Sequence, residues 1–203
     1  MPIPSYITYG FTVEKKGASP KLINQVHGNN VLSLTEGATP SATDADAVIT
    51  PQGNAYVFTA DCLPVLFFSE DRESPVAAVH AGWKGLKARV IQTVWDELQD
   101  LPGPWHVVLG PCLLKCCFEV KADFIQAFTQ SDIDVSDFIE NREGKTFFDP
   151  LSFVLQMQLP EEVILHRKEV TCTKCNPKNL PSFRRTGGTD PHIKAWIKKL
   201  VQK

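Results

Sequence analysis

The sequence predicts an α+β fold, in which mixed β-sheets are flanked by helices in a layered α/β sandwich. Short apolar runs typical of strands fill the first half, and no helical pattern separates several of them. This order argues against a purely doubly wound parallel sheet. Amphipathic patterns typical of helices begin at residue 86. A chain of 203 residues can bury one substantial core, so we expect a single catalytic domain over residues 1–203.

The expected strands are short runs rich in β-branched and aromatic residues, and clusters of Gly, Pro and Asp bound them. They cover residues 31–34, 56–58, 65–68, 76–79, 105–109 and 163–166.

The strongest helical pattern covers residues 86–98, where an apolar side chain recurs every four positions from Leu86 to Leu98. We expect this helix to pack on the sheet. Further helices are expected at residues 121–130, 150–158 and 191–201. The last of them has a basic end, and His192 is expected to be solvated at its start. Residues 130–144 are expected to form an exposed excursion.

Composition excludes some classes of function. The formal net charge of -2 offers no electrostatic basis for binding nucleic acid. No window of about 18 apolar residues exists to span a membrane. The first residues lack the basic start and apolar run of a signal peptide, so we expect a cytoplasmic protein. In that reducing compartment the six cysteines are expected to be thiols or metal ligands.

Two histidines and one cysteine have the character of a metal site with one open position. Cys62 follows the strand-like residues 55–59, and His80 closes another strand-like run, so both are expected at strand ends. With His27 they provide the two imidazoles and one thiolate of a zinc site whose fourth position is left for water or substrate. Gly82 and Gly85 would allow a tight turn beside a ligand. The alternative is that the three side chains are core residues without a metal.

The segments that carry these residues resemble the laccase-domain or polyphenol-oxidase-like family. The similar segments are residues 25–28 (Gln-Val-His-Gly), 44–50, 59–65 (Thr-Ala-Asp-Cys-Leu-Pro-Val), 79–85, 110–112, 116–120 and 182–185. The family's metal-binding His, Cys and His fall on His27, Cys62 and His80. Members are described as purine nucleoside phosphorylases with adenosine deaminase and methylthioadenosine phosphorylase activity, and one branch as peptidoglycan editing factors.

The resemblance therefore implies a zinc-dependent enzyme whose partners are a purine nucleoside and phosphate. Zinc at this site would lower the pKa of a water for attack on the purine C6, which fits deamination. For phosphorolysis, the metal, Lys84 and either Arg184 or Arg185 are candidates to hold phosphate, with Asp61 as acid or base. Glu119 is a candidate contact for the purine or ribose. The structural alternatives are that Asp61 caps a turn and that Lys84 is a solvated charge at a helix start.

Other functions are compatible with the same side chains. Cys62 activated by His80 or His27 would be the nucleophile of a thiol amidase acting on a cell-wall precursor. Copper oxidation is disfavoured, because a multicopper centre needs roughly eight or more imidazoles and the chain has five histidines.

Two departures from the family's pattern affect the transfer of its activity. Only residues 14–20 separate the strand-like residues 9–12 from Leu22, where family members carry several tens of residues more. The segment Thr186-Gly187-Gly188 stands where the family has Thr-Gly-Arg. A nucleoside-binding protein without activity is therefore a third interpretation.

The remaining cysteines allow two interpretations. Cys172 and Cys175 have the spacing of a zinc knuckle and could form a structural site with Cys112, Cys116 or Cys117. Alternatively, Cys116 and Cys117 are packed residues near the active site. His106 and His166 lie in strand-like runs and are expected to be core or surface residues.

Overall fold

The computed structural model describes residues 2–35 and 43–200, and its strands form three sheets. The largest has six strands, in the order β11 (Ile164–His166), β7 (Trp105–Leu109), β5 (Leu63–Ser69), β6 (Val76–Ala81), β3 (Ala47–Thr50) and β2 (Val31–Ser33). A second sheet has the order β1 (Ile7–Glu14), β12 (His192–Lys199) and β4 (Gly53–Thr59), all antiparallel. In the six-stranded sheet, only the outer pairs β11–β7 and β2–β3 are parallel.

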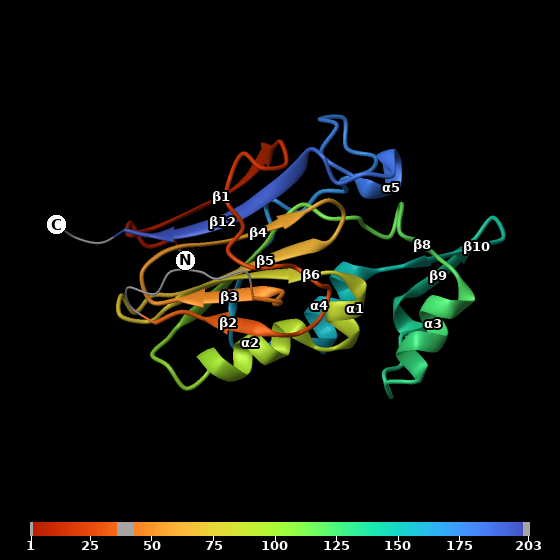
Figure 1. Cartoon of the computed structure of the whole chain (residues 1–203). Helices are drawn as coiled ribbons and strands as arrows, with labels where there is room; N and C mark the ends of the chain where they lie inside the picture. Colours follow the sequence, from red (N-terminus) through yellow and green to blue (C-terminus); the bar gives the residue numbers. More distant parts are fainter. Residues whose placement is uncertain (1, 36–42, 201–203) are drawn as a thin grey trace.

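The molecule has three layers, with the β1-β12-β4 sheet over one face of the six-stranded sheet and helices over the other (Figure 1). Alternation along the central strands produces this arrangement, because successive side chains of a strand point to opposite faces. In β5, Leu66 and Phe68 belong to the core against the β1-β12-β4 sheet, whereas Val65 and Phe67 belong to the core under the helices. Both faces of the six-stranded sheet are therefore buried.

The helix expected at residues 86–98 is two helices, α1 (Trp83–Lys87) and α2 (Val90–Leu98). The prediction of one continuous helix was wrong at Arg89, which has a left-handed backbone with φ of 61°. The apolar stripe survives the break, because Leu86 at the end of α1 and Leu98 of α2 are both buried in the same core. The separate direction of α1 places it beside the end of β6 (Figure 1).

A small sheet with the order β8 (Glu119–Val120), β10 (Lys145–Phe148) and β9 (Ile139–Arg142) lies at one end of the molecule, next to α3 (Ala122–Thr129) (Figure 1). The exposed excursion expected at residues 130–144 is only partly exposed. It contains the 3₁₀ turn η1 (Ser136–Phe138) and β9, and it buries Ile133, Val135 and Phe138. Helix α4 (Pro150–Met157) follows, with Asp149 capping its first turn through Ser152.

The prediction of a helix at residues 191–201 was wrong, because residues 192–199 form the strand β12. Residue 201 lies outside the described range. Ile193, Ala195 and Ile197 are buried at every second position, which is the period of a strand. Pairing with β1 on one side and β4 on the other places β12 at the centre of its sheet. His192 is also not solvated, since it is only 8% exposed.

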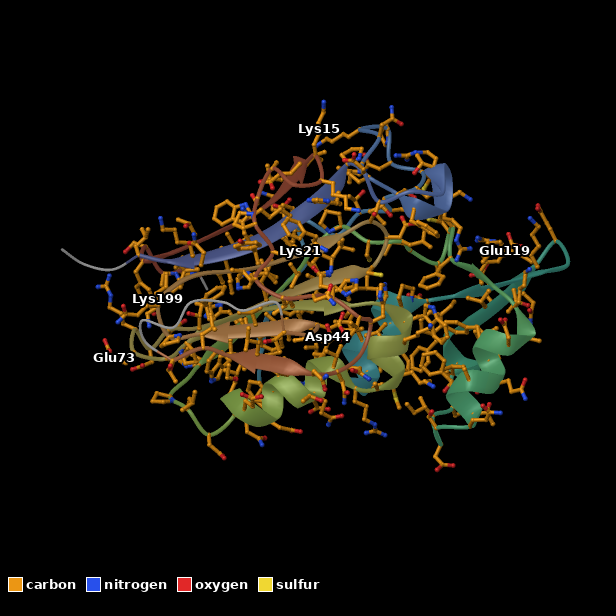
Figure 2. The ribbon with its side chains drawn as sticks, in the orientation of Figure 1. Lys15, Lys21, Asp44, Glu73, Glu119 and Lys199 are labelled. Atoms are coloured by element: carbon orange, nitrogen blue, oxygen red, sulfur yellow. The ribbon has the colours of Figure 1, made fainter. Side chains whose placement is uncertain are left out.

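The α+β prediction is confirmed, and every expected strand has a counterpart among the described strands. His106 is fully buried, and its Nδ1 lies 2.7 Å from Nε2 of His166, so both histidines belong to the packing of the sheet. Lys199 is likewise mostly buried, at the opposite end of β12 from helix α5 (Phe183–Thr186) (Figure 2). Its ammonium donates to the carbonyls of Pro51 and Ser74. The described residues contain no helix long and apolar enough to cross a membrane.

We expect Ile197→Ala to lower the free energy of unfolding by about 2–5 kcal/mol, because it opens a cavity between the two sheets. Lys198→Ala, at the next and exposed position, should change it by less than about 0.5 kcal/mol. Urea unfolding of both variants measures this difference. Similar losses for the two substitutions would contradict the strand register.

Candidate active site

His27, Cys62 and His80 come together at one end of the central strands. Their ligand atoms all lie within 4.8 Å of one another. His27 belongs to the loop before β2, Cys62 immediately precedes β5, and His80 is the penultimate residue of β6. The two imidazole rings are almost perpendicular, with centroids 4.7 Å apart. A group of two imidazoles and one thiolate is able to hold a metal ion and leave a position open.

A buried carboxylate, Asp46, orients two of these ligands. One of its oxygens lies 2.7 Å from Nδ1 of His80 and accepts the backbone N–H of His27 at 2.9 Å. The other accepts the N–H of Gly28 at 2.6 Å. Since Asp46 occupies Nδ1, the Nε2 atom of His80 is the one left for a metal. The sequence analysis did not identify Asp46, although it lies in one of the similar segments.

Gly82 is required by close approach rather than by a special backbone angle. Its φ is -72°, which any residue adopts. A Cβ at this position would lie 2.9 Å from Cδ2 of His27 and 3.1 Å from Sγ of Cys62. At Gly85, a Cβ would lie 2.9 Å from the carbonyl oxygen of Gly28. The two glycines therefore allow α1 to pack closely against the loop that carries His27 and Gly28.

We name His27, Cys62 and His80 the triad. Its electrostatics favour the thiolate of Cys62, which is the form that binds metals. Burial alone would raise the pKa of Cys62, but the positive charge of His80 and hydrogen bonds from His27 and His80 lower it to about 6. Burial would lower the pKa of His80, but the Cys62 thiolate and the bond to Asp46 raise it to about 9. The pocket thus stabilises a thiolate at neutral pH, and a thiolate is the form that binds metals.

Two cavities meet at the triad, and His27 and Cys62 line both. The first, of about 390 Å³, has Trp83, Phe118 and Phe183 in its walls, and we name it the aromatic cavity. The second, of about 400 Å³, is lined by Lys16, Lys21, Thr59 and His192 among others, and we name it the lysine cavity. Both volumes fall in the range of small-molecule sites.

Two residues that line the lysine cavity each carry a buried polar atom without a partner among the described residues. The atoms are Oγ1 of Thr59 and Nε2 of His192, whose residues are 2% and 8% exposed. Buried polar groups are nearly always hydrogen-bonded, so an unpaired pair beside a cavity indicates a ligand or water that completes them. The sequence analysis missed both residues. Lys21, which lines the same cavity, is exposed (Figure 2).

Asp61 lines the aromatic cavity, but its carboxylate is engaged by the protein. One oxygen accepts the hydroxyl of Thr173 and the other accepts the backbone N–H of Arg184, both at 2.6 Å. Its backbone is left-handed, with φ of 92°. The Arg184 N–H lies in the first turn of α5 (Phe183–Thr186), so Asp61 caps that turn from a distant segment.

The other predicted substrate contacts are distributed around the site. Arg184 lines the aromatic cavity, and its guanidinium donates to the carbonyl of Glu119 and lies over the Phe118 ring. Arg185 donates to carbonyls of the loop at residues 173–180. Lys84 extends over the ring of Trp83, with Nζ 5.7 Å from the ring centroid.

Glu119 lies on the small sheet at the end of the molecule (Figure 2), where its carboxylate forms an ion pair with Lys145 at 3.2 Å. The structure therefore brings Asp61 and Arg184 to the cavity wall. It directs the charged groups of Arg185 and Glu119 to partners within the protein.

Known proteins resemble this chain over most of its length. A family model described as multi-copper polyphenol oxidoreductase laccase matches residues 12–197. A Rickettsia conorii protein named purine nucleoside phosphorylase is 32% identical over 171 residues, which cover 81% of this chain and 70% of that protein. An Aquifex aeolicus protein of the same name is 33% identical over 171 residues, covering 79% and 74%. The crystal structure of a Neisseria meningitidis protein of family DUF152 matches with a TM-score of 0.81 at 25% identity, covering 99% of this chain and 97% of that one.

We expect Gly82→Ala to weaken metal binding at the triad, because the added methyl group collides with His27 and Cys62. Overpacking of this kind costs about 1–3 kcal/mol, which corresponds to roughly 5-fold to 150-fold in affinity. The matched control is Gly188→Ala, where an added Cβ meets nothing within 4 Å. Titration of metal-free protein with zinc measures both. Equal affinities for the two variants would show that the triad does not bind the metal.

Asp46→Asn should lower the affinity of the triad for zinc by about 10–100-fold, because the neutral amide orients His80 and the ligand loop less well. Asp44→Asn is the control, since Asp44 is exposed and its carboxylate accepts a bond from the side chain of Asn24, away from His27 and His80. Competition with a coloured chelator measures the affinity. An unchanged affinity in Asp46→Asn would rule out this orienting role.

Proposed function

The chain belongs to the family described as multi-copper polyphenol oxidoreductase laccase, and from that membership we propose that it is a zinc-dependent purine nucleoside phosphorylase. We further propose that the same site deaminates adenosine. The relatives from Rickettsia conorii and Aquifex aeolicus, both named purine nucleoside phosphorylase, support this proposal. The single observation that carries it is the position of the three ligand residues, where an aromatic and a lysine-lined cavity meet.

The ligand residues fit a catalytic metal. They supply three donors, with no fourth among residues 2–35 and 43–200. The thiol is stabilised as thiolate, and Gly82 leaves the space that the ligands need. A zinc ion held there would supply Lewis-acid chemistry at the junction of the two cavities. Asp46 acts as a positioning residue, because it touches the ligand His80 and not the substrate.

The aromatic cavity is proposed to receive the purine. Trp83, Phe118 and Phe183 offer ring faces on which a flat base can stack. Arg184 adds a cation at the same wall, held by its bond to the Glu119 carbonyl. Asp61 then positions Arg184 through the backbone rather than acting on the base itself, since both of its oxygens are occupied.

The lysine cavity is proposed to receive phosphate. Lys16 and Lys21 provide positive charge, and the hydroxyl of Thr59 and Nε2 of His192 provide unpaired hydrogen-bonding groups. Phosphate carries several strong acceptor oxygens and binds where such groups converge. Lys84 and Arg185 stay predicted contacts, with Arg185 already bonded to three carbonyls of a neighbouring loop.

In this proposal the purine and the phosphate occupy separate cavities that meet at His27 and Cys62, with the sugar between them. A phosphate oxygen attacks C1′, the bond from C1′ to the purine nitrogen breaks, and the purine leaves with the electron pair and takes up a proton. The products are ribose 1-phosphate and the free base. In deamination, water adds to C6 of adenosine and ammonia leaves. Holding the reactants in line removes much of the entropic cost of a two-substrate reaction.

Two other activities fit the site less well. The ligand group contains two imidazoles, far fewer than a multicopper centre requires. His106 and His166 bond to each other and to Glu70 instead. Amide hydrolysis would use Cys62 as a free nucleophile, which a bound metal would prevent. The two relatives described above are named for phosphorolysis and not for amide hydrolysis.

The test is product analysis by chromatography after zinc-loaded protein has been incubated with inosine or adenosine and phosphate. We expect hypoxanthine or adenine with ribose 1-phosphate, and inosine from adenosine. Cys62→Ala should abolish all products, because it removes a metal ligand. Zinc-loaded protein that releases no base and no inosine would refute the proposal.

Thr59→Val separates substrate binding from folding. The substitution keeps the shape and removes a buried hydroxyl that has no partner in the described structure, so stability should stay equal or rise. We expect KM for phosphate to rise by about tenfold, as for the loss of one hydrogen bond to a charged group, with adenosine deamination unchanged. An unchanged KM for phosphate would place the phosphate elsewhere.

A further inference from the structure

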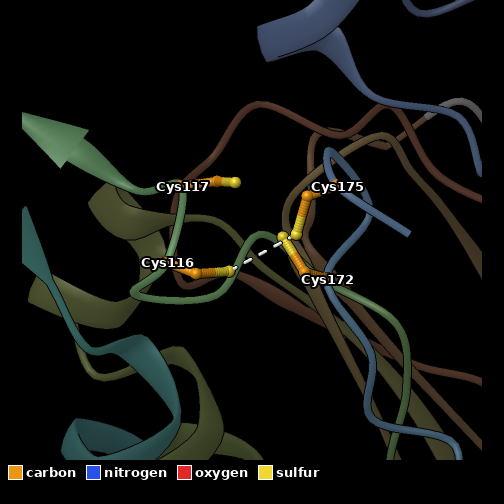
Figure 3. A group of neighbouring side chains, drawn as sticks. All are labelled: Cys116, Cys117, Cys172 and Cys175. Atoms are coloured by element: carbon orange, nitrogen blue, oxygen red, sulfur yellow. Dashed lines mark hydrogen bonds between the residues drawn. The ribbon is translucent and has the colours of Figure 1, made fainter. Parts of the chain in front are cut away.

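Four of the six cysteines form a second cluster, separate from the triad. The sulfur atoms of Cys116, Cys117, Cys172 and Cys175 all lie within 4.8 Å of one another. Two project from the loop after β7, and two from a loop more than fifty positions later in the chain (Figure 3). All six cysteines are free thiols in the structure, so no disulfide explains why the four converge.

The spacing of the sulfurs suits a tetrahedral zinc ion. A Zn–S bond of about 2.3 Å places the sulfurs of a tetrahedral site about 3.8 Å apart. Sγ of Cys116 and Sγ of Cys175 are 3.6 Å apart, and the limit of 4.8 Å on every pair leaves only small adjustments. A disulfide would instead require about 2.05 Å between two sulfurs and would leave the other two thiols unexplained.

The backbone holds the two loops together without help from the sulfurs. The N–H of Cys112 donates to the carbonyl of Thr171 at 3.1 Å, and the N–H of Thr173 donates to the carbonyl of Cys112 at 2.9 Å. Each loop is also folded on itself, as in the bond from the N–H of Asn176 to the carbonyl of Cys172 at 3.1 Å. The four thiols are therefore preorganised.

Arginine side chains surround the cluster with positive charge. Arg142 donates to the carbonyls of Lys115 and Cys116 on the first loop. Arg185 donates to the carbonyls of Thr173 and Lys174 on the second. Four thiolates exceed the charge of one Zn²⁺ by two, and two guanidiniums nearby offset that excess. This position explains Arg185 better than substrate binding does.

We propose that Cys116, Cys117, Cys172 and Cys175 bind a structural zinc ion. The ligand set is closed, with four thiolates and no position for substrate, which distinguishes it from the open triad. The position of this zinc site between the two loops indicates a structural role. The first loop continues into Phe118 of the aromatic cavity, and the second carries Thr173, which bonds Asp61. The zinc fastens two walls of that cavity to each other. The site does not depend on the proposed function.

The first experiment is elemental analysis of full-length protein purified under reducing conditions with zinc. We expect two zinc ions per chain in the wild type, one in Cys62→Ala, and none in Cys62→Ala combined with Cys175→Ser. The matched control is Cys112→Ala, which removes a buried cysteine outside the cluster and should keep both ions. A zinc-free Cys62→Ala protein, or one that holds iron in the cluster, would overturn the proposal.

Cobalt spectroscopy keeps the test valid if Cys175→Ser fails to fold. Co²⁺ added to metal-free Cys62→Ala protein should give an intense thiolate-to-cobalt charge-transfer band with tetrahedral d–d bands. Only the cluster is expected to supply several thiolates in that variant. Chelation should lower Tm by about 10 °C or more, since structural zinc contributes directly to folding. Weak octahedral bands, or a Cys116–Cys175 disulfide found by mass spectrometry in reduced zinc-treated protein, would refute a zinc site.

Discussion

One buried carboxylate, Asp46, holds the candidate active site in place. Asp46 is fully buried, and a charge in that position is tolerated only when hydrogen bonds replace the water it has lost. It receives the N–H groups of His27 and Gly28 and faces the ring of His80. The loop of the first ligand and the strand of the third therefore share one anchor. Breaking such a buried network costs about 3–5 kcal/mol, so the loop cannot drift from β6 without a large loss of stability. This constraint also holds His27 in its left-handed backbone, with φ of 62°.

A second carboxylate performs the same task for the cavity wall. Asp61 adjoins the ligand Cys62, and its strained backbone turns its carboxylate toward Thr173 and the N–H of Arg184. Residues more than a hundred positions away are thus tied to the loop between β4 and β5. Asp46 thus fixes the candidate metal ligands His27 and His80, whereas Asp61 fixes the wall of the aromatic cavity. Both lie where strands end, so the rigid sheet determines the geometry of the site.

The sequence predicted most elements, since strands and amphipathic helices leave clear periods of two and of 3.6. The predictions failed where the apolar positions fitted both the strand period and the helix period, or fitted neither. In residues 191–201 the apolar positions suit either structure, and only pairing with β1 and β4 decides for a strand. Strand β3 is four residues long and buried on both faces, so it shows no alternation. The sequence also indicated His27, Cys62 and His80 as candidate metal ligands, and the structure brings these three side chains together. Asp46, Thr59 and the partners of Arg185 were not predictable, because their roles depend on contacts between distant segments.

The two cysteine-containing sites connect through a short chain of contacts. The four-cysteine cluster holds the loop that carries Thr173, whose hydroxyl bonds Asp61, and Asp61 precedes the triad ligand Cys62. A closed site that only fastens loops can therefore affect an open site that it does not touch. Loss of the structural metal would leave Thr173 held only by hydrogen bonds, such as the one from its N–H to the carbonyl of Cys112, and would loosen Asp61 before it disturbed His27, Cys62 or His80. Since Asp46 holds His27 and His80 independently, the metal of the triad would stay bound while the aromatic wall lost its shape. The expected signature of such damage is weaker binding of the base, with metal content at the triad intact.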